Sequence, residues 1–255
     1  MTAPISYGTY LRLDELLDLQ SVQSQPEHPD ELLFIVVHQA SELWFKTLLH
    51  ELDHLIDSMR GFDTMRALLA VQRVNVLTEI VAQQLTALDT LPPQRFAQFR
   101  GYLGSSSGSQ SAQFRAIEAT AGLRDEHFLA TIHEHGDPPA AVTRALARPT
   151  LQALAQDLIA HEGVTLEALY TGPGPTPLFL LVEGLLEFEQ RFARWRFLHV
   201  QLVERIIGPG TSGTGGTLGA KYLARTVSHR FFPELWSVRS AFYGGQQAPR
   251  ESGAR

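Results

Sequence analysis

The sequence predicts an all-α protein, a helical bundle in a single domain. Apolar residues recur at intervals of three and four along most of the chain, which is the spacing of one face of a helix. No stretch rich in β-branched residues alternates apolar with polar side chains as a strand would. The 255 residues are enough to bury a substantial core. We expect one domain over residues 1–243 and a disordered polar tail over 244–255.

In the first half, helices are expected wherever the helical spacing persists between breakers. Pro26 and Pro29 separate a first short helix from a long one. The pair Pro92 and Pro93 ends the third helix, and Pro93 suits the first turn of the fourth. The expected helices span residues 7–20, 31–59, 64–88, 93–103 and 110–121, with a turn at 60–63 and a small-residue loop at 104–109.

In the second half the breakers are richer in glycine and proline. Residues 136–139, Gly-Asp-Pro-Pro, lie between two further helices, and a rigid loop at 171–177 precedes the longest amphipathic run. Gly208 ends that run, and the glycine-rich segment after it offers backbone that can approach a ligand closely. The expected elements are helices at 125–136, 139–162, 178–207 and 217–228, the glycine-rich loop at 211–219 and a final segment at 230–243.

Composition and charge exclude several classes of protein. The chain has no cysteine, which excludes disulfides, thiolate metal sites, c-type haem attachment and cysteine nucleophiles. A net charge of −6 without a basic cluster gives no general attraction to nucleic acid or anionic membranes. The longest apolar run, at 178–182, is too short to span a bilayer, and no secretory signal stands at the N-terminus. We expect a cytoplasmic protein without nucleic-acid or membrane partners.

One histidine lies on the apolar stripe of the longest run. His199 fills the gap between Trp195 and Leu202, in register with large apolar residues from Leu181 to Ile206. Its polar ring requires a hydrogen bond, a metal, or an iron porphyrin lying against the apolar face. Spacing alone favours a hydrogen-bonded core histidine over a ligand.

Two residue pairs describe a second group of candidates. Phe34 and His38 are four residues apart, as are Phe96 and Arg100, so each pair shares one helix face. The planar guanidinium of Arg100 suits a carboxylate. Together with the glycine-rich loops, these residues are typical of a mostly apolar pocket with a few placed polar groups. From spacing alone, an ordinary surface arginine is the favoured interpretation of Arg100, and His38 could likewise be a core histidine bonded to a carbonyl.

A different class of function is suggested by His50-Glu-Leu-Asp-His54, an HExxH motif. On a helix its histidines could bind zinc while Glu51 polarises a water molecule, as in a zinc hydrolase. No third ligand follows in a recognisable motif, and Asp53 and Asp57 favour a solvated helix face with intrahelical charge pairing. A third alternative is a helical interaction module without a cofactor.

Several long blocks of the chain carry a resemblance to a known family. They are YGTYLRLDELLDLQ (7–20), LFIVVHQASELWFKTLLHEL (33–52), SGSQSAQFRAIE (107–118), and FARWRFLHVQLVERIIG with the later GTGG and YLARTVSHRFFPELWSVR. In this order they resemble tryptophan 2,3-dioxygenases over nearly the whole chain. The resemblance implies a haem pocket among long helices, non-covalently bound haem b (iron protoporphyrin IX) and a homotetramer. It also implies dioxygen insertion across the indole C2–C3 bond of L-tryptophan or a close derivative, giving an N-formylkynurenine-type product.

The resemblance also implies roles for individual residues. His199 falls on the family's haem-iron ligand, His38 on the distal histidine that accepts a hydrogen bond from the indole N–H, and Arg100 on the carboxylate-binding arginine. The HExxH motif falls inside a block that the family shares, so it is explained without zinc. The other matched positions are Thr214 (substrate ammonium and carboxylate), Phe34 and Phe96 (aromatic pocket), Ser107 and Gly108 (cofactor), and Tyr7, Tyr10 and Leu11 (closing the pocket of a neighbouring subunit).

Three departures from the family pattern leave the outcome of the reaction open. Ser109 stands where the family usually has phenylalanine, Phe96 is often tyrosine, and the segment 207–214 looks one residue longer than usual. A roomier distal pocket could admit a substituted indole, or peroxide in place of dioxygen. The alternative within the family is therefore a monooxygenase that forms a 2-oxindole from a tryptophan derivative.

Overall fold

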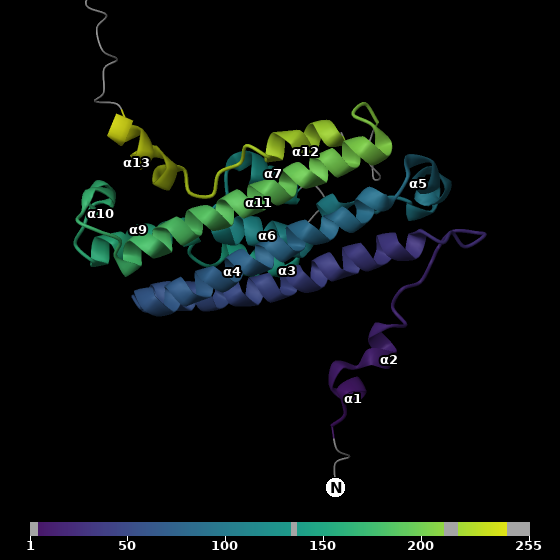
Figure 1. The fold of residues 1–255 in the computed structure, drawn as a ribbon, viewed down its shortest axis with the longest axis horizontal. Coiled ribbons are helices and arrows are strands. Elements are labelled where there is room, and N and C mark those ends of the chain that lie inside the picture. Colours follow the sequence, from purple (N-terminus) through teal and green to yellow (C-terminus); the bar gives the residue numbers. More distant parts are fainter. Residues whose placement is uncertain (1–4, 134–136, 212–218, 244–255) are drawn as a thin grey trace, which may run out of the picture.

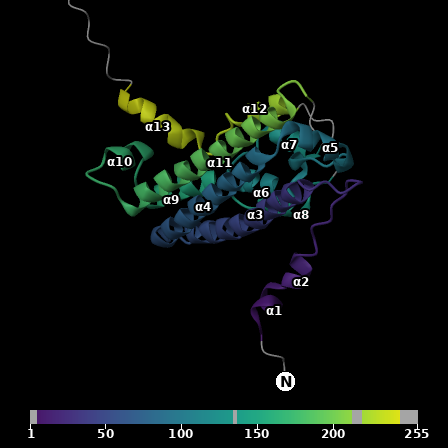
Figure 2. The ribbon, with the colours of Figure 1, turned by 45° about the vertical axis from the view of Figure 1, so that its right-hand side comes forward.

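Three long helices form the frame of the molecule: α3 (Glu31–Arg60), α4 (Thr64–Gln84) and α11 (Pro177–Ile207). The computed structural model describes residues 5–133, 137–211 and 219–243, and every regular element in those ranges is a helix. The three helices run side by side along the long axis, with α4 packed against both α3 and α11 (Figure 1 and Figure 2). The all-α prediction is confirmed.

Shorter helices cover this frame. Helices α6 and α9 pack against α3, and α12 packs against α11. Helices α1 and α2 project away from the bundle in both views and bury none of their residues (Figures 1 and 2). The shorter α-helices are α1 (Tyr7–Leu11), α2 (Leu13–Leu16), α5 (Pro93–Phe99), α6 (Ala112–Ala121), α7 (Glu126–His133), α8 (Ala140–Leu146), α9 (Leu151–His161), α10 (Leu166–Thr171), α12 (Ala220–Thr226) and α13 (Pro233–Tyr243), and 3₁₀ turns lie at η1 (Leu85–Thr90), η2 (Arg100–Leu103) and η3 (Gly108–Gln110).

The core consists of the apolar faces of the frame helices. Leu52 and Leu55 of α3, Val71 and Val74 of α4 and Leu185 of α11 have no exposed surface. Burying each such side chain contributes roughly 1.5–3 kcal/mol. The predicted apolar stripe of α11 faces inward, because Leu181, Leu185, Phe188, Phe192 and Leu202 are all buried.

Helices α4 and α11 approach each other closely at Gly184. A Cβ atom on this glycine would lie 2.7 Å from Cγ1 of Val71, closer than real side chains come. Beside this contact the buried amide of Asn75 donates to the carbonyl oxygen of Gly184 at 3.0 Å and to a carboxylate oxygen of Glu187 at 3.2 Å. The glycine therefore allows a backbone contact that a side chain would prevent.

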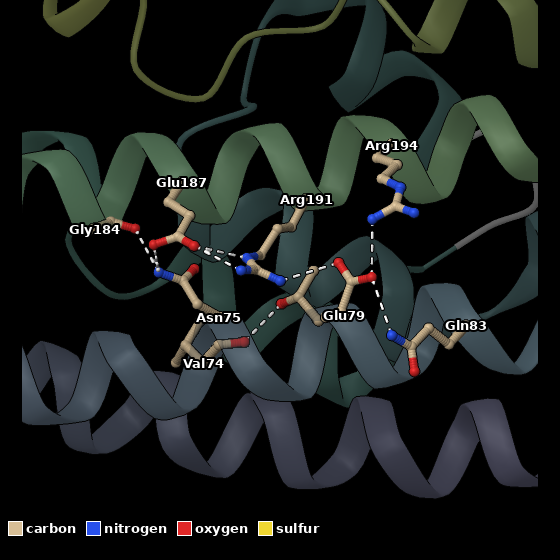
Figure 3. Close-up of polar contacts among 9 residues, drawn as sticks. Val74, Asn75, Glu79, Gln83, Gly184, Glu187, Arg191 and Arg194 are labelled. Carbon is tan, nitrogen blue, oxygen red and sulfur yellow. Dashed lines mark hydrogen bonds and ion pairs between the residues drawn. The ribbon is translucent and has the colours of Figure 1, made fainter.

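Charged side chains continue this α4–α11 seam toward solvent (Figure 3). One carboxylate, that of Glu79 on α4, accepts from Arg191 at 3.0 Å and from Arg194 at 2.9 Å. Arg191 also pairs with Glu187 one turn earlier on its own helix, at 2.7 Å. Partly exposed pairs of this kind contribute little to stability individually, and together they join the surfaces of α4 and α11.

Several expected boundaries are wrong, for local reasons. The expected helix 7–20 divides into α1 and α2 because Arg12 adopts the left-handed conformation, with φ 51°. The expected helix 139–162 is interrupted before Pro149, since a residue preceding proline avoids the helical region, and Thr150 then caps α9. The end of the helix expected at 64–88 tightens into η1, and α10 was not predicted at all.

A buried carboxylate holds the chain after α12 against α11. Glu189, without exposed surface, accepts the backbone N–H groups of Phe231 and Phe232 at 2.7 and 2.8 Å. It also accepts the indole N–H of Trp236 at 2.6 Å and pairs with Arg230 at 3.1 Å. These charge-assisted bonds satisfy the carboxylate and fix the path that leads into α13.

Helix α3 alone among the described residues combines the length and apolarity of a membrane-spanning segment. The expectation that the longest apolar run lies at 178–182 was wrong, because residues 32–37 of α3 form an uninterrupted run of six apolar residues against five there. Averaged over an 18-residue window, α3 reaches a hydropathy of 1.3, yet only 17% of that window is buried within this chain. Much of its apolar surface therefore faces either a cavity or the outside of the bundle.

Candidate functional site

A cavity of about 710 Å³ opens at the end of the bundle where α3, α5, α11 and α12 meet. This volume lies within the range of small-molecule and cofactor sites. Among the expected site residues, Phe34, His38, Phe96, Arg100, Ser107, Gly108 and His199 all line it. Leu202 and Ile206, expected on the apolar stripe of the longest run, also line the cavity, and further walls are Val37, Phe45, Leu85, Leu88 and Phe114.

His38 reaches the cavity from α3 with a defined tautomer. Its Nδ1 lies 2.7 Å from the backbone carbonyl oxygen of Phe34. A carbonyl can only accept, so Nδ1 carries the hydrogen and donates it, and in the neutral ring Nε2 is left as an acceptor. Burial lowers the pKa of His38, although the Phe34 carbonyl and the charge of Glu42 oppose that shift. The ring therefore faces the cavity neutral, with one free lone pair.

His199 reaches the same cavity from α11. Its ring stacks against the indole of Trp195 one turn earlier, with centroids 5.1 Å apart. Burial, followed by the charge on His38, lowers the pKa of His199 to about 4. Desolvation is the largest cause of the lowered pKa for both rings, although His38 is exposed and His199 half-buried by surface area. At neutral pH the cavity thus holds two uncharged imidazoles.

Aromatic rings form the wall between α3 and α5. Phe34 lies 5.5 Å from Phe96 and 5.8 Å from Phe99, measured between ring centroids. Phe99 is completely buried, whereas Phe34 keeps an edge on the cavity. Arg100 follows at the end of α5, half-buried, and lines the cavity beside this wall. A planar apolar group and an adjacent carboxylate would both find partners here.

Small polar residues form another part of the rim. The backbone N–H of Ser107 donates to the side-chain oxygen of Gln110 at 3.2 Å, which holds the loop in a tight turn. Ser111 then caps α6 by accepting from the backbone N–H of Phe114 at 3.1 Å. Ser107, Gly108 and Ser111 all line the cavity. A cofactor or substrate there would meet backbone and hydroxyl groups rather than bulky side chains.

The cavity wall also contains a buried ion-pair network that was not predicted from the sequence, and both of its arginines, Arg115 and Arg196, line the cavity. Arg196, 2% exposed, donates to Glu118 at 2.7 Å, and the other oxygen of Glu118 accepts from Arg115 at 2.9 Å. The guanidinium of Arg196 also packs on the rings of Phe192 and Phe231, at 4.9 and 5.1 Å. The available signal was a charged residue next to Trp195 on the inward side of α11. This pair joins α6 to the helix that carries His199.

Not every expected site residue meets at the cavity. Tyr7, Tyr10 and Leu11 lie on α1, are exposed, and do not line the cavity of their own chain. Thr214 lies outside the described residues, so the structure neither brings it to the cavity nor separates it. Ser109 belongs to the turn η3, next to Gly108.

The HExxH motif lies on an exposed face of α3, away from the cavity. Glu51 is held by Arg73 on α4 at 3.2 Å. Asp53 and Asp57 both pair with Arg148, which precedes α9, so the expected intrahelical charge pairing was wrong: the partner is on another element. Among the described residues no cluster of three or more histidines and carboxylates could hold a metal. A hydrolytic zinc centre finds no third protein ligand there.

The residues present fit a flat apolar group that carries a metal. Haem requires apolar walls, an imidazole with a free lone pair and an opposite face left open for a second ligand. The cavity offers aromatic and aliphatic walls, neutral His199 on one helix, and His38 on another. The donor set thus suits a porphyrin iron better than a hydrated cation, which prefers oxygen ligands.

Comparison with known proteins gives a consistent result over almost the whole chain. The family model described as Tryptophan 2,3-dioxygenase matches residues 1–136 and 154–242. A tryptophan 2,3-dioxygenase of Herpetosiphon aurantiacus is 40% identical, covering 94% of this chain and 99% of that protein. Those of an Anaeromyxobacter species and of Kineococcus radiotolerans are 38% and 39% identical, covering 94% of this chain and 97% and 92% of their own lengths.

Proposed function

The chain belongs to the tryptophan 2,3-dioxygenase family, and we propose how its cavity serves an oxygenase that acts on tryptophan. Both atoms of dioxygen are added across the indole C2–C3 bond, giving an N-formylkynurenine-type product. Substrate plus dioxygen equals product in atoms and electrons, so no external reductant is consumed. The observation that carries the proposal is the presence of two neutral imidazoles, from α3 and α11, in one apolar cavity.

The family generally uses haem, and we propose that His199 is the iron ligand of a non-covalently bound haem b. The neutral imidazole has the lone pair that ligation requires. The ring of Trp195 restricts its rotation by stacking against it. Ser107 and Gly108, which also line the cavity, would help to hold the cofactor. When bound, haem supplies the iron at which dioxygen is activated.

The substrate would be held by the α3 and α5 side of the cavity. The indole ring packs against Phe34 and Phe96, and its N–H donates to the free Nε2 of His38. Arg100 pairs with the carboxylate, and Thr214 contacts the amino-acid end. The apolar walls exclude water and fix the orientation of the C2–C3 bond, so positioning supplies much of the rate acceleration.

We propose that the chain acts as a homotetramer in the cytoplasm. The projecting α1 and the exposed side chains of Tyr7 and Tyr10, 76% and 74% exposed, support an arm that completes the cavity of another subunit. Exposed apolar residues on α3 and α4, such as Val36 and Leu69, provide further surface for subunit contacts. A cysteine-free chain has no need of an oxidising compartment.

The test is to incubate the reduced, haem-loaded protein with L-tryptophan and dioxygen and to weigh the product. A gain of two oxygen atoms supports the proposal. A gain of one would select the monooxygenase that forms a 2-oxindole, and the replacement of the family phenylalanine by Ser109 would then be the first position to restore. Unchanged tryptophan under these conditions would contradict the proposed substrate.

A variant separates the cofactor's role from the fold. We expect His199→Ala to lose the haem absorption bands while retaining its helical content, because His199 lines the cavity and is not part of the main apolar core. His54→Ala, which removes an exposed imidazole outside the cavity, is the matched control and keeps its pigment. Full haem binding by His199→Ala would remove His199 from the proposed role.

A further inference from the structure

The two histidines of the HExxH motif have no role in the proposed reaction, yet their geometry is specific. His50 and His54 are exposed, lie one turn apart on α3, and place their Nε2 atoms 3.1 Å from each other. Their ring planes are almost perpendicular, with centroids 4.5 Å apart. One imidazole donates its Nε2–H to the Nε2 lone pair of the other, so a single hydrogen lies between the two nitrogen atoms.

The distance between the two Nε2 atoms suits two ligands of one first-row transition-metal ion. Metal–imidazole bonds of 2.0–2.1 Å place two neighbouring nitrogens about 2.9 Å apart at a right angle and about 3.3 Å apart at the tetrahedral angle. The observed 3.1 Å lies between these values. An ion could replace the shared hydrogen without moving the helix, because the ring that donates needs only to shift its hydrogen to Nδ1.

We propose that His50 and His54 form a surface clamp for a divalent transition-metal ion, separate from the haem site. The protein supplies two nitrogen ligands and water completes the coordination, since no third histidine or carboxylate joins them among the described residues. Cu²⁺ binds more tightly than Zn²⁺, following the general order of affinities for nitrogen ligands. The ion links two adjacent turns of α3 and so opposes their unfolding.

The site binds a metal without catalysing hydrolysis. Glu51, which would serve as the general base of a zinc hydrolase, has a side chain only 12% exposed and is engaged by Arg73. The clamp also lies about 18 Å along the helix from His38, given twelve residues at 1.5 Å each. An ion there does not reach the reacting atoms in the cavity.

Charges facing the clamp provide a second test of the geometry. Asp53 and Asp57 each follow one of the histidines by three residues, so they lie beside the clamp on the same face of α3. Both carboxylates are at present paired with Arg148, whose positive charge opposes a bound cation. Removing Arg148 should strengthen metal binding, an effect opposite in sign to the loss of a histidine.

The experiment is a calorimetric titration of the untagged, haem-loaded protein with Cu²⁺ and, separately, with Zn²⁺. We expect a site that binds one ion per chain, with Cu²⁺ the tighter. His54→Gln should weaken it by at least about tenfold, since loss of a ligand costs no less than loss of an outer partner. Arg148→Gln should tighten it several-fold. His161→Gln, which removes an exposed imidazole that stacks on Phe62 elsewhere, should leave it unchanged.

Equal affinity in His54→Gln and the parent protein would overturn the proposal, as would an equal loss in His161→Gln. Because all three side chains are on or near the surface, the variants are expected to fold, and the haem absorption spectrum checks this. A melting temperature that rises with Cu²⁺ in the parent but not in His54→Gln would support the clamp independently of calorimetry.

Discussion

His38 illustrates how a single backbone contact sets the chemistry of a side chain. The carbonyl of Phe34, one turn earlier, occupies Nδ1 and thereby directs the lone pair of Nε2 to the cavity. The i, i+4 spacing was visible in the sequence, but the tautomer was not. It depends on where the hydrogen bond is made, and neither spacing nor residue type reports that.

Arg100 is the residue at which substrate recognition can be tested most directly. We expect Arg100→Ala to raise the Michaelis constant for L-tryptophan by about ten- to hundredfold, since a charge-assisted bond to a carboxylate contributes roughly 1.5–3 kcal/mol. Tryptamine, which lacks the carboxylate, is the matched control and should lose almost nothing. Steady-state kinetics with both substrates measures the difference, and an equal loss for both would remove Arg100 from carboxylate binding.

The two cavity histidines predict how the haem-free protein responds to acid. His199 has its pKa lowered from 6.5 to about 4, mainly by burial and then by the charge on His38. Between pH 6.5 and 4, His199 is protonated in the unfolded chain but stays neutral in the folded chain. The free energy of unfolding therefore falls as the pH is lowered through this range. The full effect is at most about 3 kcal/mol, reduced by the open side of the ring.

Denaturant titrations of haem-free protein at several pH values measure this slope. In His199→Leu the decline between pH 6.5 and 4 should be smaller, because one of the two imidazoles no longer resists protonation. An unchanged slope would mean that the His199 ring is solvated enough to titrate normally. The comparison with the parent cancels the contribution of carboxylates elsewhere in the chain.

At the scale of elements, long helices were predictable and short ones were not. α3 and α11 have many turns of apolar residues on one face, so the periodic signal is repeated often enough to be read. α10 has six residues, too few for a period, and depends on the Thr165 cap. The break at Arg12 arises from one left-handed residue. Such boundaries are set by single backbone angles and by tertiary contacts that the sequence does not display.

The residues of the cavity also divide into those that the sequence predicts and those that it does not. His38, Phe96, Arg100 and His199 were identified because their positions combine helical spacing with a block-by-block resemblance to a family. The ion pair between Arg196 and Glu118 was missed, since its partners are 78 residues apart and only the packing of α6 on the bundle brings them together. Spacing along one helix carries no information about a partner on another.

The α4–α11 seam provides the prediction at this scale. Gly184→Ala should destabilise the protein, because the new methyl group meets the buried side chain of Val71 at 2.7 Å. Overpacking costs about 1–3 kcal/mol, and the better helix propensity of alanine returns about 1. We expect a net loss of about 1 kcal/mol, equivalent to a melting temperature lower by about 2–4 °C.

Gly174→Ala is the matched control for this substitution. Gly174 lies in the loop before α11, and nothing is within 4 Å of the position of its added methyl group. Thermal unfolding followed by circular dichroism compares the two variants. If Gly184→Ala melts no lower than Gly174→Ala, the close approach of α4 and α11 is not as rigid as the contact implies.

At the scale of the whole molecule, the described residues form one large apolar cluster, two smaller ones and a projecting arm. Residues of α3, α4, α6, α9 and α11 belong to a single apolar cluster, which supports our proposal that residues 1–243 act as one domain. Helices α1 and α2 contribute nothing to it. An arm with no buried residue in its own chain gains stabilising contacts if it packs against another subunit.

Subunit mixing tests whether the arm works on a neighbour. A chain lacking residues 1–19 should have little activity alone, and His199→Ala should have none. Mixed tetramers of the two should recover activity, because the intact arm of the His199→Ala chain completes the cavity of the armless chain. Turnover after co-refolding is the measurement, with either variant refolded alone as control. No recovery would show that the arm acts within its own chain or not at all.

The stacking of Trp195 on His199 has one more consequence. An indole held 5.1 Å from the ring expected to bind the iron would transfer its excitation energy to a porphyrin with great efficiency. The chain contains only two other tryptophans, so its ultraviolet emission should dim as the pigment enters and brighten as it leaves. The intensity of this emission therefore measures the fraction of chains that hold the pigment, with no need for a substrate or for turnover.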